Sequence, residues 1–151
     1  DLGKALTDVS LLPRHHGHEE AGVIPIEVFC ARLGLGKDWR NAGVLASMEH
    51  LNVHRFAERR NVNKVDMILA ADRTMLKTEG LADVCEADAL GRVPRGGVTG
   101  PALLRELAPV VRNAAIGVPP ETLVGPEIGL WIRAERGRVV VEYMKGKVGV
   151  C

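Results

Sequence analysis

Aromatic residues, cysteines and long apolar runs are all scarce in this chain of 151 residues. Phe, Trp and Tyr make up 3% of it, which argues against widespread stacking on single-stranded bases. The three cysteines, Cys30, Cys85 and Cys151, have no C-x-x-C spacing, so a reducing cytoplasm fits better than a disulfide framework. No apolar run approaches the roughly 20 residues needed to cross a bilayer, so we expect no membrane association.

The charges are nearly balanced. Lys and Arg number 20 and Asp and Glu number 19, and the resulting net charge of +1 predicts no strong overall attraction to nucleic acid. The chain begins at Asp1 without a methionine or a signal peptide, inside what looks like a motif. We therefore expect it to be a fragment of a longer protein.

The apolar residues recur at helical spacing, which predicts an all-α fold. We expect helices over residues 19–35, 37–55, 63–73 and 79–90. The positions expected to face the core are Val23, Ile26, Cys30, Leu33, Trp39, Val44, Leu45, Met48, Val65, Ile68 and Leu69.

Glycine and proline divide the rest of the chain. Gly96, Gly97 and Gly100 predict a flexible joint, after which Pro101 opens a helix that ends near Gly117. The last helix is expected to run from Pro119-Pro120 to about Glu135. Residues 138–142 could form a short strand or be frayed.

Histidine gives the clearest indication of chemistry. Three of the five histidines fall within residues 13–20 (PRHHGHEE), and His50 and His54 follow on one face of a predicted helix. Neutral imidazoles and carboxylates are the usual ligands of zinc, nickel, manganese and iron, so a metal site is the functional interpretation. Histidines in a turn bounded by Gly and Pro can equally be solvated, and that alternative stays open.

Charged residues add candidates to this site. Asp1 and Asp72 carry carboxylates that could hold a metal, although each is also explained as an exposed or ion-paired side chain. Lys4 could neutralise a phosphate oxygen. Basic residues that recur in the middle of the chain would serve either as phosphate contacts for RNA or as a solvated face; they are Arg55, Arg59, Arg60, Lys64, Arg73 and Lys77. Phosphate-loop, G-x-S-x-G and H-E-x-x-H motifs are absent.

Taken together, several segments resemble the HD domain of bacterial multifunctional CCA proteins. These proteins are CCA-adding tRNA nucleotidyltransferases, and the HD domain is their C-terminal region. The resemblance is clear over residues 1–92, and the LPRHHGH run at its distance from DLGK is specific to this family. The segments that carry it are residues 1–7 (DLGKALT), 12–19 (LPRHHGHE), 27–33 (EVFCARL), 49–54 (EHLNVH), Asp72 and 85–92 (CEADALGR).

This resemblance implies an HD-domain helical bundle over residues 1–92, followed by a helical tail over residues 93–151 that could bind tRNA. It implies metal-dependent hydrolysis of 2′,3′-cyclic phosphates, 2′-nucleotides and phosphomonoesters, with nickel or another transition metal. In this family a separate nucleotidyltransferase head adds CCA to tRNA with magnesium and nucleoside triphosphates. The implied partners are tRNA and such nucleotides, with a monomer or homodimer as the assembly.

The resemblance also implies roles for individual residues. Asp1 matches the acid of the family's His-Asp dyad, and His50 matches a later functional histidine. The expected metal ligands are Asp1, His18, His50 and Asp72; the expected catalytic residues are Asp1, His50 and Lys4; the expected substrate-binding residues are Arg14, His15, His16 and His54. Leu51 and Leu90 stand where the family has Asp and Arg. Leu51 favours the alternative of a non-catalytic scaffold for tRNA binding or dimerisation, with a decayed metal site.

Overall fold

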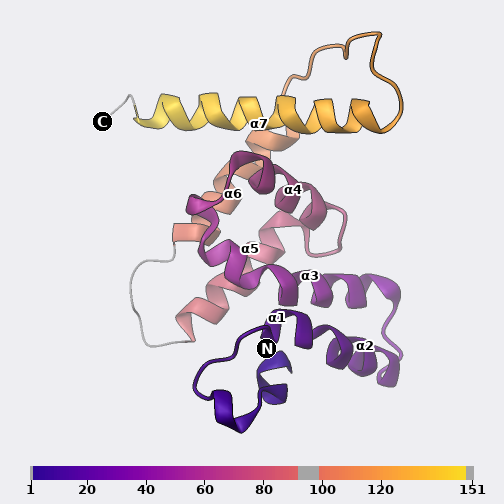
Figure 1. Cartoon of the computed structure of the whole chain (residues 1–151), viewed down its shortest axis with the longest axis vertical. Helices are drawn as coiled ribbons and strands as arrows, with labels where there is room; N and C mark the ends of the chain where they lie inside the picture. Colours follow the sequence, from indigo (N-terminus) through magenta and orange to yellow (C-terminus); the bar gives the residue numbers. More distant parts are fainter. Residues whose placement is uncertain (1, 92–98, 149–151) are drawn as a thin grey trace.

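The computed structural model describes residues 2–91 and 99–148, and this part of the chain is helical without any strand (Figure 1). The predicted all-α class is therefore confirmed. In chain order the elements are the 3-10 helices η1 (Leu2–Leu6) and η2 (Val9–Leu11), then α1 (His18–Ala21), α2 (Val23–Arg32), α3 (Lys37–His54), η3 (Phe56–Glu58), α4 (Asn61–Asp72), α5 (Lys77–Leu90), α6 (Thr99–Arg112) and α7 (Pro126–Val148).

The helix expected over residues 19–35 is divided into α1 and α2 at Gly22. Close approach of the backbone explains the glycines here. A Cβ on Gly22 would lie 2.5 Å from the Oγ of Ser47 in α3, and a Cβ on Gly3 would lie 1.8 Å from the carbonyl oxygen of His18. These two glycines therefore let η1, α1 and α3 meet at one place.

The helices α3, α4 and α5 follow the predicted ranges closely, because their apolar residues are regularly spaced. Val65 and Ile68 are buried as expected. Leu33 and Trp39 were expected in the core and are 57% and 56% exposed, so these two predictions were wrong. Leu33 follows the last residue of α2 and Trp39 lies in the first turn of α3, so both are close to the connection between these two helices.

The C-terminal part departs most from expectation. Gly100 was expected in a flexible joint and Pro101 at the start of a helix, but both are buried inside α6, which ends at Arg112 rather than near Gly117. The helix α7 begins at Pro126 rather than at Pro119. The helix α7 continues through residues 138–142, where a strand or a frayed tail was expected. Its Val140 is fully buried in the common core, which explains why these residues stay helical despite their β-branched side chains.

One hydrophobic core joins the middle and the end of the chain. It combines Val53 and Phe56 with Ile68 of α4, and Leu104 of α6 packs into the same cluster. A Cβ on Gly100 would lie 2.0 Å from the carbonyl oxygen of Val53, so α6 begins in direct backbone contact with α3. The division into domains at residues 92 and 93 stays a prediction, and Gly96 and Gly97 lie outside the described residues.

The helices α1 and α2 lie at one end of the molecule, and α7 crosses α4 and α6 at the other (Figure 1). The long helix α3 packs against α1 and α2 and also against α5 and α6, and it carries both His50 and His54 as predicted. Within residues 2–91 and 99–148, no helix is long and apolar enough to cross a membrane.

Candidate metal centre

Two histidines far apart in the sequence meet between α1 and α3. His18 opens α1, His50 lies in the last turns of α3, and their Nε2 atoms are 3.1 Å apart. Both side chains are buried, at 6% exposure each. Ser47 helps to hold the two helices together, because its hydroxyl donates to the carbonyl oxygen of Glu19 at 2.9 Å.

The other ring nitrogen of each histidine faces a backbone carbonyl. The Nδ1 of His18 lies 2.5 Å from the oxygen of His15, and the Nδ1 of His50 lies 2.8 Å from the oxygen of Ser47. A carbonyl oxygen can only accept, so each Nδ1 carries the ring proton. In the neutral rings, each Nε2 therefore presents a lone pair to the other histidine.

Two lone pairs at this distance repel unless a cation lies between them, either a shared proton or a metal ion. Burial lowers the pKa of His50, and the charge of His18 lowers it further, which favours the neutral form that binds metals. Metal-ligating histidines usually donate their second ring N–H to a carbonyl or carboxylate, as both rings do here. The arrangement thus has the donor chemistry of a metal centre.

The distance between the two nitrogens also fits. With metal–nitrogen bonds of about 2.0–2.1 Å, two neighbouring imidazole nitrogens on one ion stand roughly 2.9–3.4 Å apart. Among the residues that the structure describes, no group of three or more His, Cys, Asp or Glu side chains is arranged to hold a metal. Two of the four expected ligands, His18 and His50, thus lie together in the described part of the chain, and Asp1, a third, lies outside it.

A pocket of about 210 Å³ opens beside His50. Most of its lining is apolar, and Ser47, His50 and Asp88 are its polar members. The apolar members are Leu2, Ile26, Gly43, Ala46 and Val84. Asp88 of α5 also binds His54, whose Nε2 lies 3.0 Å from its Oδ2. His54 is thus oriented by a carboxylate at the edge of the pocket.

The residues expected to contact the substrate near the start of the chain differ in how far they are buried. His15 is half-buried, with its Nδ1 2.9 Å from the hydroxyl of Thr7. Arg14 and His16 are exposed, and Lys4 is half-buried in η1. The structure thus brings His18 and His50 together, whereas Arg14 and His16 lie on the surface of the loop before α1.

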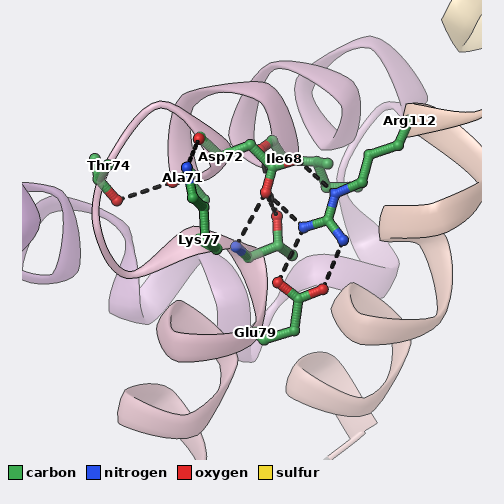
Figure 2. Close-up of polar contacts among 8 residues, drawn as sticks. Ile68, Ala71, Asp72, Thr74, Lys77, Glu79 and Arg112 are labelled. Carbon is green, nitrogen blue, oxygen red and sulfur yellow. Dashed lines mark hydrogen bonds and ion pairs between the residues drawn. The ribbon is translucent and has the colours of Figure 1, made fainter.

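Asp72 takes part in a different cluster, shown in Figure 2. Its two carboxylate oxygens accept hydrogen bonds from Arg112 at 2.6 and 2.7 Å, and Thr78 donates to it at 2.8 Å. Arg112 also binds Glu79, so it joins α6 to α4 and α5. The hydrogen bonds from Arg112 are the main reason why the pKa of Asp72 falls to about 2. The structure gives Asp72 the contacts of a helix-joining ion pair.

Sequence reasoning overlooked two residues of the site. Asp88 was not among the expected site residues, yet it lines the pocket and binds His54. Its place in the CEADALGR segment was the available signal. Ser47 anchors His50 through its backbone oxygen, and no sequence pattern indicates such a contact.

Three known proteins that resemble the chain carry the same name, multifunctional CCA protein. This chain is 40% identical over 134 residues to the multifunctional CCA protein of Xanthomonas axonopodis pv. citri. The alignment covers 85% of this chain and 33% of that protein. The chain is 34% identical over 154 residues to the multifunctional CCA protein of Paracidovorax citrulli. That alignment covers 95% of this chain and 36% of the relative. The multifunctional CCA protein of Legionella pneumophila subsp. pneumophila is 40% identical over 91 residues, which cover 59% of this chain and 22% of that protein. No protein-family model and no solved structure matches.

The fold and the paired imidazoles define an all-α domain with a candidate metal centre. The chain is homologous to the multifunctional CCA proteins, which confirms the family resemblance. It spans about a third of the length of the relatives that it matches.

Proposed function

We propose that this chain is the HD-type phosphohydrolase region of a CCA-adding tRNA nucleotidyltransferase, and that it forms the C-terminal part of that enzyme. Its substrates would be 2′,3′-cyclic phosphates, 2′-nucleotides and phosphomonoesters at or near a tRNA 3′ end. The observation that carries the proposal is the pair of Nε2 atoms of His18 and His50, 3.1 Å apart. The homology supports tRNA as the partner, and a cytoplasmic location goes with it.

His18 and His50 would hold a divalent transition metal, with nickel as the first candidate. Asp1 and a histidine before it are the further ligands that the resemblance implies. We leave Asp72 out of this set, because Arg112 binds both of its oxygens. The bound metal would supply an activated water and neutralise charge on the phosphoryl oxygens. Magnesium would serve only nucleotidyl transfer by the whole enzyme.

The remaining residues would bind and orient the substrate. The apolar side of the pocket, formed by Ile26, Ala46 and Val84, would contact the nucleoside. His54, oriented by Asp88, would contact the polar part of the substrate. Lys4, Arg14, His15 and His16 would then attract the phosphate, because all four lie on the segment that leads to His18.

A scaffold for tRNA binding or dimerisation is the second candidate. Leu51 favours it, because the family pattern has an Asp after this histidine. The two candidates differ in whether the His18–His50 pair supports chemistry.

The test compares phosphate release from a 2′,3′-cyclic nucleotide, with and without nickel, by the complete protein. His50→Ala should abolish the metal-dependent rate and leave CCA addition largely intact. Leu51→Asp should raise that rate. Equal and metal-independent rates for the wild type and both variants would reject the enzyme and leave the scaffold.

A further inference from the structure

The helix α2 is apolar on two opposite sides, and within the described residues only one of these sides is covered. Ile26 and Cys30, four residues apart, face α3: Cys30 is buried, and a Cβ on Gly43 of α3 would lie 3.0 Å from the Cγ2 of Ile26. Ile24 and Val28 are also four residues apart, and they lie about 200° around the helix from Ile26 and Cys30. Both of these side chains are exposed, at 70% and 60%.

The exposed apolar surface continues toward the start of α3. Phe29 is more than half exposed, as are Leu33 and Trp39 near the connection between the two helices. Of the ten residues of α2, only Glu27 and Arg32 are charged. A helix that is apolar all round is normally buried on all sides, so α2 has the composition of a helix that is covered twice. We call its exposed side the α2 face; it comprises Ile24, Val28, Phe29, Leu33, Leu35 and Trp39.

The charges around the α2 face indicate what kind of surface would cover it. Glu27 and Asp38 carry negative charges, Arg32 and Lys37 carry positive charges, and all four are exposed. Anionic lipid and nucleic-acid backbones attract an excess of basic residues, and this balanced set has none. An apolar centre with a rim of mixed charges is the usual composition of a contact between two folded protein surfaces.

The relatives indicate which protein surface is at hand. The aligned regions cover about a third of their length, and in the proposed enzyme the remaining part precedes Leu2. The helix η1 packs against α1 and α2, and Leu2 lines the same pocket as Ile26. Since α2 is only about 15 Å long, the preceding polypeptide arrives within one helix length of the α2 face. A domain tethered at such a short distance has an effective concentration of about millimolar, which favours it over a separate molecule.

We propose that the α2 face docks against the N-terminal part of the same polypeptide, which contains the nucleotidyltransferase head. This inference rests on the proposed place of the chain at the C-terminal end of a longer enzyme, and not on the metal centre or on hydrolysis. The contact buries the apolar side of α2 that faces away from α3. It also fixes His18 relative to the head, because α1, which His18 opens, meets α2 at Gly22 (Figure 1).

Hydroxyl-radical footprinting tests the contact by comparing the complete protein with the 151-residue chain. Both are measured with EDTA present, at concentrations where sedimentation shows a monomer. Phe29 and Trp39 should be oxidised several-fold more slowly in the complete protein, because the docked head covers them. Leu130 of α7, which is exposed at the other end of the molecule, is the internal reference and should be oxidised at the same rate in both.

Variants separate the contact from the fold. In the complete protein, Val28→Glu should restore oxidation of Phe29 to the rate seen in the 151-residue chain. Leu130→Glu is the matched control and should leave Phe29 protected. Both side chains are exposed in a helix, so neither change should alter urea unfolding of the 151-residue chain. If Val28→Glu does alter it, Ile24→Glu takes its place with the same expected result.

Equal oxidation of Phe29 and Trp39 in the complete protein and the 151-residue chain overturns the proposal. Unchanged protection in the charged variant does so as well. Protection that appears in the 151-residue chain as its concentration rises assigns the face to a second copy. Binding of that chain to vesicles of phosphatidylcholine and phosphatidylglycerol assigns it to a membrane, and either result overturns the proposal. CCA addition by the complete protein is measured separately, so that a failure of the proposed function is distinguished from a failure of docking.

Discussion

The Nε2 atoms of His18 and His50 face each other at 3.1 Å, although 32 residues separate the two histidines in the chain. Each ring is fixed by a hydrogen bond from Nδ1 to a backbone carbonyl three residues earlier. The pair therefore presents two lone pairs to one point before any ion binds. Such preorganisation is expected of a site that binds a cation.

Gly3 is predicted to be essential for this arrangement. Gly3→Ala would place a Cβ 1.8 Å from the carbonyl oxygen of His18, so η1 has to move away from α1. We expect a loss of about 2–4 kcal/mol in the free energy of unfolding, measured by urea denaturation. The control is Gly129→Ala, whose Cβ meets nothing within 4 Å in α7, and it should stabilise by about 0.5–1 kcal/mol. A stability of Gly3→Ala equal to the wild type would contradict the close contact.

The ion pair of Asp72 with Arg112 predicts a loss of stability in acid. The pKa of Asp72 is about 2 in the folded chain, against an ordinary value of 3.8, so the unfolded chain binds more protons in this range. The contribution is therefore present above about pH 4 and is lost as the pH falls toward 2. Because both partners are partly exposed, we expect about 1–2 kcal/mol.

Urea unfolding between about pH 5 and pH 2.5 measures this contribution. Arg112→Gln should be less stable than the wild type at the upper end, and the difference should shrink as the pH falls. Arg138→Gln is the control, because Arg138 is 73% exposed and pairs with Glu135 of its own helix. A difference between wild type and Arg112→Gln that stays constant with pH would show that Asp72 is not stabilised by the pair.

The apolar side of the pocket predicts an effect on substrate binding alone. Val84→Asp puts a charge where we propose that the nucleoside lies, so KM for a 2′,3′-cyclic nucleotide should rise roughly tenfold or more. Nickel affinity and kcat should change less than KM, because His18 and His50 are themselves unchanged in this variant. The control is Val118→Asp, which makes the same change at a side chain that is 90% exposed. An unchanged KM in Val84→Asp would remove the pocket from the substrate site.

The regular helices could be predicted from the sequence because their apolar spacing is regular. The range of α3 was predicted almost to the residue, and Val65 and Ile68 were correctly placed in the core. The start of α7 could not be predicted from its prolines, because Pro119 and Pro126 are both acceptable first residues of a helix. Residues 138–142 are helical because Val140 is buried against other helices. The local sequence cannot indicate this burial, since it reflects only the preference of β-branched residues for strands.

The candidate site was only partly visible in the sequence. The histidines stand out because of their residue type and spacing, and the resemblance singled out His18 and His50 from the five. The sequence did not indicate that Arg112, 40 residues along the chain, would bind Asp72. Nor did it indicate that Asp88 would reach His54 across two helices, because such contacts depend on how helices pack.

The central claim is that His18 and His50 bind one metal ion together. The most direct measurement is a calorimetric titration of the chain with nickel at neutral pH. We predict that the wild type binds nickel, that His18→Ala and His50→Ala each weaken binding roughly tenfold or more, and that affinity falls below about pH 6 as protons compete. His16→Ala, a change at an exposed histidine of the same segment, should bind as the wild type does. Absence of nickel binding by the wild type, or equal affinity in His16→Ala, His18→Ala and His50→Ala, would contradict the claim.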